Sequence, residues 1–364
     1  MSPKFGGKLI RDGVSLLLTI GCATLAGKLF YEFDIPAPYL LGSMLGVWFV
    51  SVAVRPMRSC LYVPRWFHKC VVLSLGVLVG AMFEPESIEQ LLNWTITLTG
   101  MLIATVVATC VGYWYLTRLR GYDPVLALFC AIPGGQAEVI LLSREFVDKD
   151  YVVALCHLIR VVVVFCSVPL ALALIMGEAA VQESNRNLTG LPSLIDLPAS
   201  TLLQFLAIAL IGFTSARLIG APVPYLMGPL FLSMALHLTG YVDIPRISEF
   251  VLLAQVTIGG AVGARLGQVE MKVLGPHIRD ALINVSMVLA VFVGFAFLTS
   301  MLAGIKFFNV MLAFVPGGLY EITLLTLVFG FDVAFVAVHH ATRMLFILLS
   351  LPGLIRLVSR RGAK

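Results

Sequence analysis

The stretch PGGQAEVILL at residues 133–142 recurs as PGGLYEITLL at residues 316–325, and this pair decides the fold. Each copy lies inside a long apolar run, at 124–143 and at 307–329. Proline lacks an amide proton and glycine disfavours the helical state, so the three residues together interrupt a helix. The sequence therefore predicts two short half-helices in each run, each about eight residues or 12 Å long, which meet at a non-helical tip.

Other landmarks recur in the same order, 183 or 186 residues apart. They are PYLLG at 38–42 with PYLMG at 224–228, Gly76 and Gly80 with Gly259 and Gly263, and His157 and Arg160 with His340 and Arg343. Several landmarks in one order indicate an internal duplication. We therefore expect a first membrane repeat at 1–177, a polar linker at 178–199 and a second membrane repeat at 200–364.

The composition points to a protein that lies in a lipid bilayer. Of 364 residues, 59% are hydrophobic and 12% are charged, and the mean hydropathy is +0.98. Soluble domains carry about 25% charged residues. We predict an all-α polytopic membrane protein with about 10 to 12 hydrophobic segments. The predicted segments are 14–29, 38–54, 70–83, 91–117, 124–143, 151–177, 200–216, 223–240, 250–267, 280–303, 307–329 and 332–356.

The sequence alone leaves open whether the broken segments cross the bilayer or turn back. Crossing gives six spans in each half and parallel repeats, whereas turning back gives five spans and inverted repeats. Basic residues gather on the cytoplasmic side, and in the first half they lie in the N-terminal tail, at 55–69 and at 118–120. This places the N-terminus in the cytoplasm and the chain in the cytoplasmic membrane. In the second half, inversion puts four basic loop residues inside and two outside, which favours inverted repeats.

Two buried arginines mark the candidate site. Arg160 is the one charged residue between Val152 and Leu174, and Arg343 lies at the matching place in its half. A cation at that depth costs at least about 2.5–3.5 kcal/mol, so each arginine needs a partner inside the protein or a wet cavity. Glu138 and Glu321, three residues past the paired glycines, are the expected partners. His157 and His340 lie one helical turn before the arginines and share their face.

The broken helices supply the other groups of a binding site. Backbone N–H groups after the glycines suit an anion or a polar group, and the released carbonyl groups suit a cation. Broken helices in inverted repeats form the sites of many secondary transporters. A purely structural role, in which each glutamate neutralises its arginine, stays open. The candidate substrate- or ion-binding residues are Pro133, Gly134, Gly135, Glu138, His157, Arg160, Pro316, Gly317, Gly318, Glu321, His340 and Arg343.

Neither a metal centre nor a cofactor is expected. His339 and His340 are neighbours on a helix and point about 100° apart, and no third ligand cluster accompanies them. The seven cysteines lie in the first half and form no CxxC pair. The net charge of +5 comes from short clusters beside apolar runs, so it indicates topology and gives no sign of direct nucleic-acid binding.

The PGG stretches, together with VVALCHLIRV at 152–161 and FVAVHHATRM at 335–344, resemble the AbrB-duplication membrane family. Its members carry two copies of a unit with a PGG motif and a later arginine-containing helix. They are labelled as ammonia monooxygenases or as regulators of gene expression. A monooxygenase would need a redox centre, and a DNA-binding regulator would need a basic soluble module; neither is visible in the sequence.

The leading hypothesis is a secondary transporter or exporter of a small solute, coupled to H⁺ or Na⁺, with an oligomeric state left open. The alternative is a membrane protein that affects gene expression indirectly, by sensing a solute or recruiting a partner. A membrane-bound ammonia monooxygenase is disfavoured, and we expect no enzymatic activity.

Overall fold

A computed structural model describes the chain apart from residues 1–2, 86–92, 135, 178–181, 183–189, 222 and 363–364. None of the described residues lies in a strand. They group into two compact units. Unit 1 comprises Met1–Pro85, Phe165–Val269 and Leu327–Phe331, and unit 2 comprises Glu86–Val164, Glu270–Thr326 and Asp332–Lys364. Each unit combines segments of both predicted repeats, and most of the predicted linker at 178–199 falls outside the described residues.

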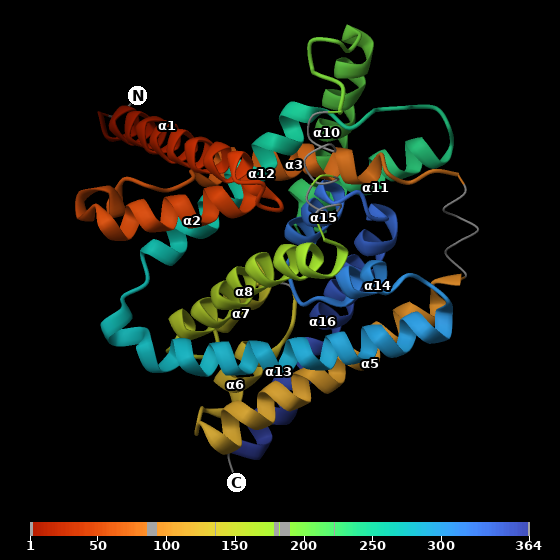
Figure 1. The fold of residues 1–364 in the computed structure, drawn as a ribbon. Coiled ribbons are helices and arrows are strands. Elements are labelled where there is room, and N and C mark those ends of the chain that lie inside the picture. Colours follow the sequence, from red (N-terminus) through yellow and green to blue (C-terminus); the bar gives the residue numbers. More distant parts are fainter. Residues whose placement is uncertain are drawn as a thin grey trace. The chain divides into compact units, whose positions relative to one another are not determined.

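The α-helices of each unit are labelled in Figure 1. Unit 1 holds α1 (Pro3–Glu32), α2 (Pro38–Ala53), the 3₁₀ helix η1 (Arg55–Ser59), α3 (Arg65–Gly80), α10 (Ala199–Leu218), α11 (Pro224–Leu238) and α12 (Ser248–Gly267). Unit 2 holds α5 (Thr95–Trp114), the π-helix η2 (Tyr115–Leu119), α6 (Pro124–Ala131), α7 (Gln136–Ser143), α13 (Met271–Ala303), α14 (Phe307–Phe314) and α16 (Val333–Gly362). Residues of α8 (Asp150–Met176) and α15 (Leu319–Val328) fall in both units.

The all-α polytopic prediction is confirmed. Within the described chain, seven helices are long and apolar enough to cross a membrane. Every predicted apolar segment contains a helix, and the two segments with Pro-Gly-Gly are each split in two. The split segments give α6 and α7 with eight residues each, α14 with eight and α15 with ten. The proline and the glycines thus end one helix and allow the next to begin in a new direction.

Glycines let the helices of unit 1 approach closely. A Cβ atom built on Gly76 of α3 would lie 2.7 Å from the carbonyl oxygen of Leu226 in α11, and one built on Gly259 of α12 would lie 2.5 Å from that of Leu40 in α2. Any larger side chain would push these helices apart. The two contacts join residues that correspond at offsets of 183 and 186, as an internal duplication would produce.

The helices α5 and α13 of unit 2 lie side by side and run in opposite directions (Figure 1). A side chain at Gly100, near the start of α5, would collide with Thr299 near the end of α13. At the other end of the pair, a Cβ atom on Gly112 would lie 2.6 Å from Oδ1 of Asn284. The segment that corresponds to α5 at an offset of 183 lies within α13, so corresponding segments are antiparallel.

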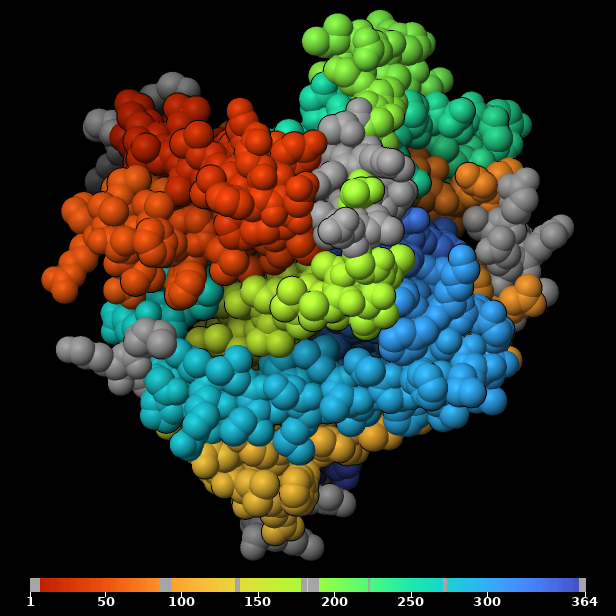
Figure 2. Space-filling view, viewed as in Figure 1, coloured from red at the N-terminus to blue at the C-terminus, as the bar shows by residue number. Residues whose placement is uncertain are grey.

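The outer face of α13 is apolar. Figure 2 shows this helix as a continuous band on the surface of unit 2. Its large exposed side chains are Leu282, Ile283, Val293, Phe297, Leu298, Met301 and Leu302. Such a face over a helix of 33 residues is suited to hydrocarbon, which agrees with a lipid environment.

The first broken hairpin, α6 and α7, begins and ends at the same end of unit 2. One pocket is lined by Tyr122 and Asp123 from the loop before α6 and by Val147 and Lys149 from the loop after α7. A segment that crossed the bilayer would place these two loops about 30 Å apart. The hairpin therefore turns back inside the unit.

The second broken hairpin, α14 and α15, also turns back, from the opposite end. Phe307 at its start contacts Phe297 near the end of α13, with ring centroids 6.2 Å apart. Phe335, just after the hairpin, contacts Trp94 at the start of α5, with centroids 5.3 Å apart. Because α5 and α13 are antiparallel, the start of α5 and the end of α13 lie together. Both hairpins thus return to the end of unit 2 from which they start. The inverted repeats that the sequence favours would have this feature, and they stay a prediction.

This arrangement predicts a labelling pattern. In a variant without native cysteines, Arg118→Cys and Asp148→Cys should react with an impermeant maleimide from the same side of the membrane, which we expect to be the cytoplasm. Lys306→Cys and Asp332→Cys should both react from the other side. If Asp148→Cys reacted from the side opposite to Arg118→Cys, the first hairpin would cross the membrane and the inverted arrangement would be wrong.

Candidate functional site

The first broken hairpin exposes the end of a short helix inside unit 2. Asp123 caps the start of α6 by accepting hydrogen bonds from the amides of Val125 (2.9 Å) and Leu126 (3.2 Å). The helix ends at Ile132, whose ψ of 125° leaves the helical region. The last four carbonyl groups of a helix have no partner within it. Here they are buried among apolar residues, so other groups of the protein have to satisfy them.

Arg160 and His157 of α8 satisfy these carbonyl groups. The Arg160 guanidinium donates to the carbonyl oxygens of Ile132 (2.5 Å) and Cys130 (2.9 Å), and Nε2 of His157 lies 3.1 Å from that of Phe129. A carbonyl oxygen only accepts, so the proton of His157 is on Nε2. Its Nδ1 then accepts from Nη1 of Arg160, at 3.4 Å.

The second broken hairpin repeats these contacts. The Arg343 guanidinium donates to the carbonyl oxygens of Phe314 (2.8 Å) and Val315 (3.1 Å). Nε2 of His340 lies 3.0 Å from the carbonyl oxygen of Leu312, and its Nδ1 lies 2.9 Å from Nη2 of Arg343. The contact of His157 with Phe129 corresponds to that of His340 with Leu312, at an offset of 183. The contact of Arg160 with Ile132 corresponds to that of Arg343 with Val315 at the same offset. The sequence therefore builds the same joint twice.

The partners of the arginines differ from the sequence expectation, which named the two glutamates. Within the described residues, neither Arg160 nor Arg343 forms an ion pair with a carboxylate. Glu138 lies instead in the first turn of α7, and Glu321 in the first turn of α15. At that position a carboxylate complements the positive end of the helix and can reach back to the N-cap. The glutamates therefore belong to the helix starts, and the arginines belong to the helix ends.

Glu321 also explains the second glycine of its motif. Its carboxylate folds back over Gly318, so that a Cβ atom on Gly318 would overlap Oε2. Glu321 is 3% exposed, which leaves the carboxylate little room to move. Gly135, the matching glycine of the first hairpin, lies outside the described residues.

The two breaks meet at Arg343. Besides its contacts with the second break, this side chain has its Nε 3.7 Å from the position of a Cβ atom on Gly134, in the first break. Pro133 and Gly134 are buried, as are Pro316, Gly317 and Gly318. The described residues of both breaks are thus buried inside unit 2, whereas Glu138 is half-buried.

The helix ends and the charged side chains of the site complement each other. The carbonyl ends of α6 and α14 are bound by two guanidinium groups. The starts of α7 and α15 direct their positive ends toward the breaks, where Glu138 and Glu321 complement them. The site thus contains two guanidinium groups and two carboxylates.

A sequence profile of the family described as "Transition state regulatory protein AbrB" matches residues 44–359. The chain belongs to this AbrB family. It is 24% identical over 355 residues to an Escherichia coli (strain K12) protein named "Putative regulator AbrB", with 96% of each chain covered. It is 22% identical over 301 residues to YhjN of Bacillus subtilis (strain 168), covering 79% of this chain and 77% of the relative.

Several contacts of this AbrB-family chain could not be found from the repeated motifs. The Arg343 guanidinium lies over the ring of Phe292, 5.6 Å from its centroid. His339 points away from His340 and lies 2.9 Å from the hydroxyl of Thr97. Asn284 is fully buried beside Gly112. In the sequence, the one sign of its importance was a polar residue within an apolar run, four residues after Asp280. Within the described part of the chain, no three His, Cys, Asp or Glu side chains are grouped to hold a metal ion.

Proposed function

We propose that this protein is a secondary transporter of a small solute. The observation that carries the proposal is the meeting of two buried, broken hairpins at Arg343, each entering unit 2 from a different end. Such hairpins place helix ends and charges inside an apolar protein, where they can replace the water around a solute. A purely structural brace would need one arginine on each break, but it would not require the breaks to meet.

The inverted arrangement supports alternating access. If the two halves arose by duplication, the site lies near the axis that relates them, and each end of unit 2 offers an equivalent hairpin. A rocking motion could then open the same site first to one side and then to the other. The contacts repeated at an offset of 183 support the duplication, which stays a prediction.

The remaining parts of the proposal concern the setting. The protein would lie in the cytoplasmic membrane with its N-terminus in the cytoplasm, as the basic loops favour. Its twelve candidate residues would bind the solute directly or hold the breaks in shape. Glu138 and Glu321 are the candidate proton carriers if H⁺ is the coupling ion. Coupling to Na⁺, assembly into oligomers and the absence of enzymatic activity also stay predictions.

Flux through proteoliposomes tests transport. With a panel of radiolabelled metabolites, the wild type should take up at least one solute above the level of empty vesicles. The double variant Glu138→Ala with Glu321→Ala should lose that flux by about tenfold or more, equivalent to about 1.4 kcal/mol or more. The matched control, Glu32→Ala with Glu145→Ala, removes two exposed carboxylates and should retain it. Equal flux in the wild type and the first double variant would count against transport at this site.

The name of the Escherichia coli relative favours a second candidate, an indirect effect on gene expression. In that case a deletion strain would show a transcriptional change that is restored equally by the wild-type gene and by the Glu138→Ala, Glu321→Ala gene. If transport is the activity, the variant gene should fail to restore it. Measuring transcripts in the three strains separates the two functions.

A further inference from the structure

A pocket of about 500 Å³ opens at the mouth of the first broken hairpin. It is lined by the loop before α6, the loop after α7 and His277 of α13. Phe146, which also lines it, contacts Phe129 of α6, with ring centroids 6.2 Å apart. The carbonyl oxygen of Phe129 in turn contacts His157 of the candidate site. The side chains of Phe146 and Phe129 therefore connect the pocket lining to His157 of the candidate site.

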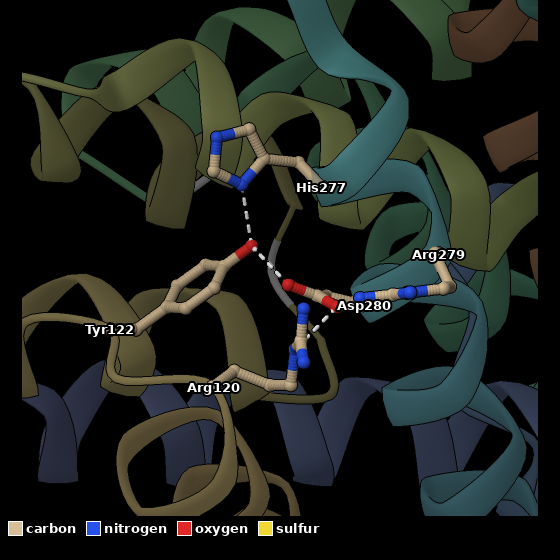
Figure 3. A network of polar contacts seen from close by, with 5 residues as sticks. All are labelled: Arg120, Tyr122, His277, Arg279 and Asp280. Atoms are coloured by element: carbon tan, nitrogen blue, oxygen red, sulfur yellow. Dashed lines mark hydrogen bonds and ion pairs between the residues drawn. The ribbon is translucent and has the colours of Figure 1, made fainter.

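A polar network ties α13 to the loop before α6 at this mouth. Nε of Arg120 lies 2.6 Å from Oδ1 of Asp280. Figure 3 shows the Tyr122 hydroxyl between His277, 2.6 Å from Nδ1, and Asp280, 3.3 Å from Oδ2. Burial, with the Asp280 carboxylate adding to it, raises the pKa of the Tyr122 hydroxyl, which keeps this group a donor. Arg279 lies 3.8 Å from the same carboxylate.

The network continues inward along one face of α13. His277, Asp280 and Asn284 have the spacing i, i+3 and i+7, which places them on one stripe of a helix. Asn284 is 0% exposed. A Cβ atom built on Gly112 would lie 2.6 Å from Oδ1 of Asn284. The same atom would lie 3.2 Å from the Cβ atom of Ala131, the last residue of α6. The stripe thus leads from the pocket to the end of α6.

Three elements that pack around α6 carry buried polar groups that lack a partner among the described residues, namely α13, η2 and α8. Within the described residues, both atoms of the Asn284 amide, the Tyr115 hydroxyl and Nε of Arg160 have no hydrogen-bond partner. Tyr115 belongs to η2, which packs against α6. Arg160 is 1% exposed and bonds the carbonyl groups around Ala131. A buried polar group without a partner destabilises the folded state, so a set of them points to a ligand.

The two breaks differ in the residue of the neighbouring helix. Arg160 and Arg343 each donate to three carbonyl oxygens, and Arg343 also stacks over Phe292. The position that corresponds to Asn284 at an offset of 183 is Met101, an apolar residue. The unpartnered amide group therefore lies at the first break.

We propose that the first break binds a small carboxylate between Arg160 and Asn284, and that this solute enters through the pocket at Tyr122 and His277. The proposal deepens the transporter function and depends on it for the movement of the solute. A guanidinium N–H, a primary amide and a phenol hydroxyl all donate to carboxylate oxygens, and the positive charge compensates for the burial of the anion. Arg343 then has a structural role.

Ligand binding to the purified protein tests the site without any transport assay. The probes are acetate, lactate and succinate, each compared with its neutral amide, and the readout is thermal unfolding in detergent with the dissociation constant taken from the titration. At least one carboxylate should raise the melting temperature while its amide does not. Asn284→Leu should weaken that binding about tenfold or more, as expected when one well-placed hydrogen bond is lost.

Two further variants make the result decisive. Asn284→Asp keeps the size of the side chain and adds a negative charge, so it should abolish binding even if Asn284→Leu is poorly folded. Ser286→Ala removes an exposed hydroxyl from another face of α13 and should bind as the wild type does. Binding that is unchanged in Asn284→Asp would overturn the proposal, as would equal stabilisation by the amides. Carboxylate binding without flux would instead leave the site intact and remove the transporter function.

Discussion

Arg343→Met is expected to lower the stability of the protein by about 3 kcal/mol or more. The substitution keeps a long side chain but removes every donor from the carbonyl groups of Phe314, Val315 and Gly317. These groups lie in a buried break where water does not replace the lost bonds. Unfolding of the purified protein by heat and by denaturant in mild detergent would measure the loss.

Arg144→Met is the matched control. Arg144 is exposed and pairs with Asp150 at 3.2 Å, and such surface pairs contribute about 1 kcal/mol or less. The loss of stability in Arg343→Lys should lie between those of Arg343→Met and Arg144→Met. An ammonium group donates hydrogen bonds, but it lacks the planar guanidinium that reaches several oxygens. If Arg343→Met and Arg144→Met were equally stable, the guanidinium would not hold the second break together.

Gly318→Ala is expected to reduce transport about tenfold or more and to destabilise the protein by about 1–3 kcal/mol. The new methyl group would overlap the Glu321 carboxylate, and the buried carboxylate would have to leave the start of α15. Flux in proteoliposomes and thermal unfolding would measure the two effects. Gly353→Ala in α16 is the control, since a Cβ atom there meets no neighbour within 4 Å.

A double variant isolates the cause. In a Glu321→Ala background the carboxylate is absent, so Gly318→Ala should cost little further stability. The coupling energy of the cycle should then be about as large as the effect of Gly318→Ala alone. Additive effects would show that the glycine serves another purpose, such as the backbone angles of the turn.

The sequence predicted the elements of this fold better than their partners. Pro-Gly-Gly within an apolar run breaks a helix wherever it occurs, so the motif predicts a helix break directly. Both predicted breaks agree with the structure. The predicted pairing of Glu138 with Arg160 was different from the observed contacts. Opposite charges on neighbouring segments suggest an ion pair, but the sequence does not show that the broken helix ends carry carbonyl groups for the guanidinium to bind.

The contacts at the pocket were the hardest to predict. Tyr122 lies 155 residues before His277 and 158 before Asp280 along the chain, and no repeated motif includes these residues. Their meeting depends on the antiparallel packing of α5 and α13, which follows from the direction in which the first hairpin returns. Loop charges favoured that direction without determining it, so a single sequence could not join these residues.

The guanidinium groups that bind the helix ends are attached to the chain by covalent bonds. In a carrier that binds a metal ion at the carbonyl end of a broken helix, the positive charge leaves together with the ion. In the proposed transport cycle the two guanidinium groups would stay at these carbonyl groups throughout. The empty protein would then need no bound ion there before it reorients.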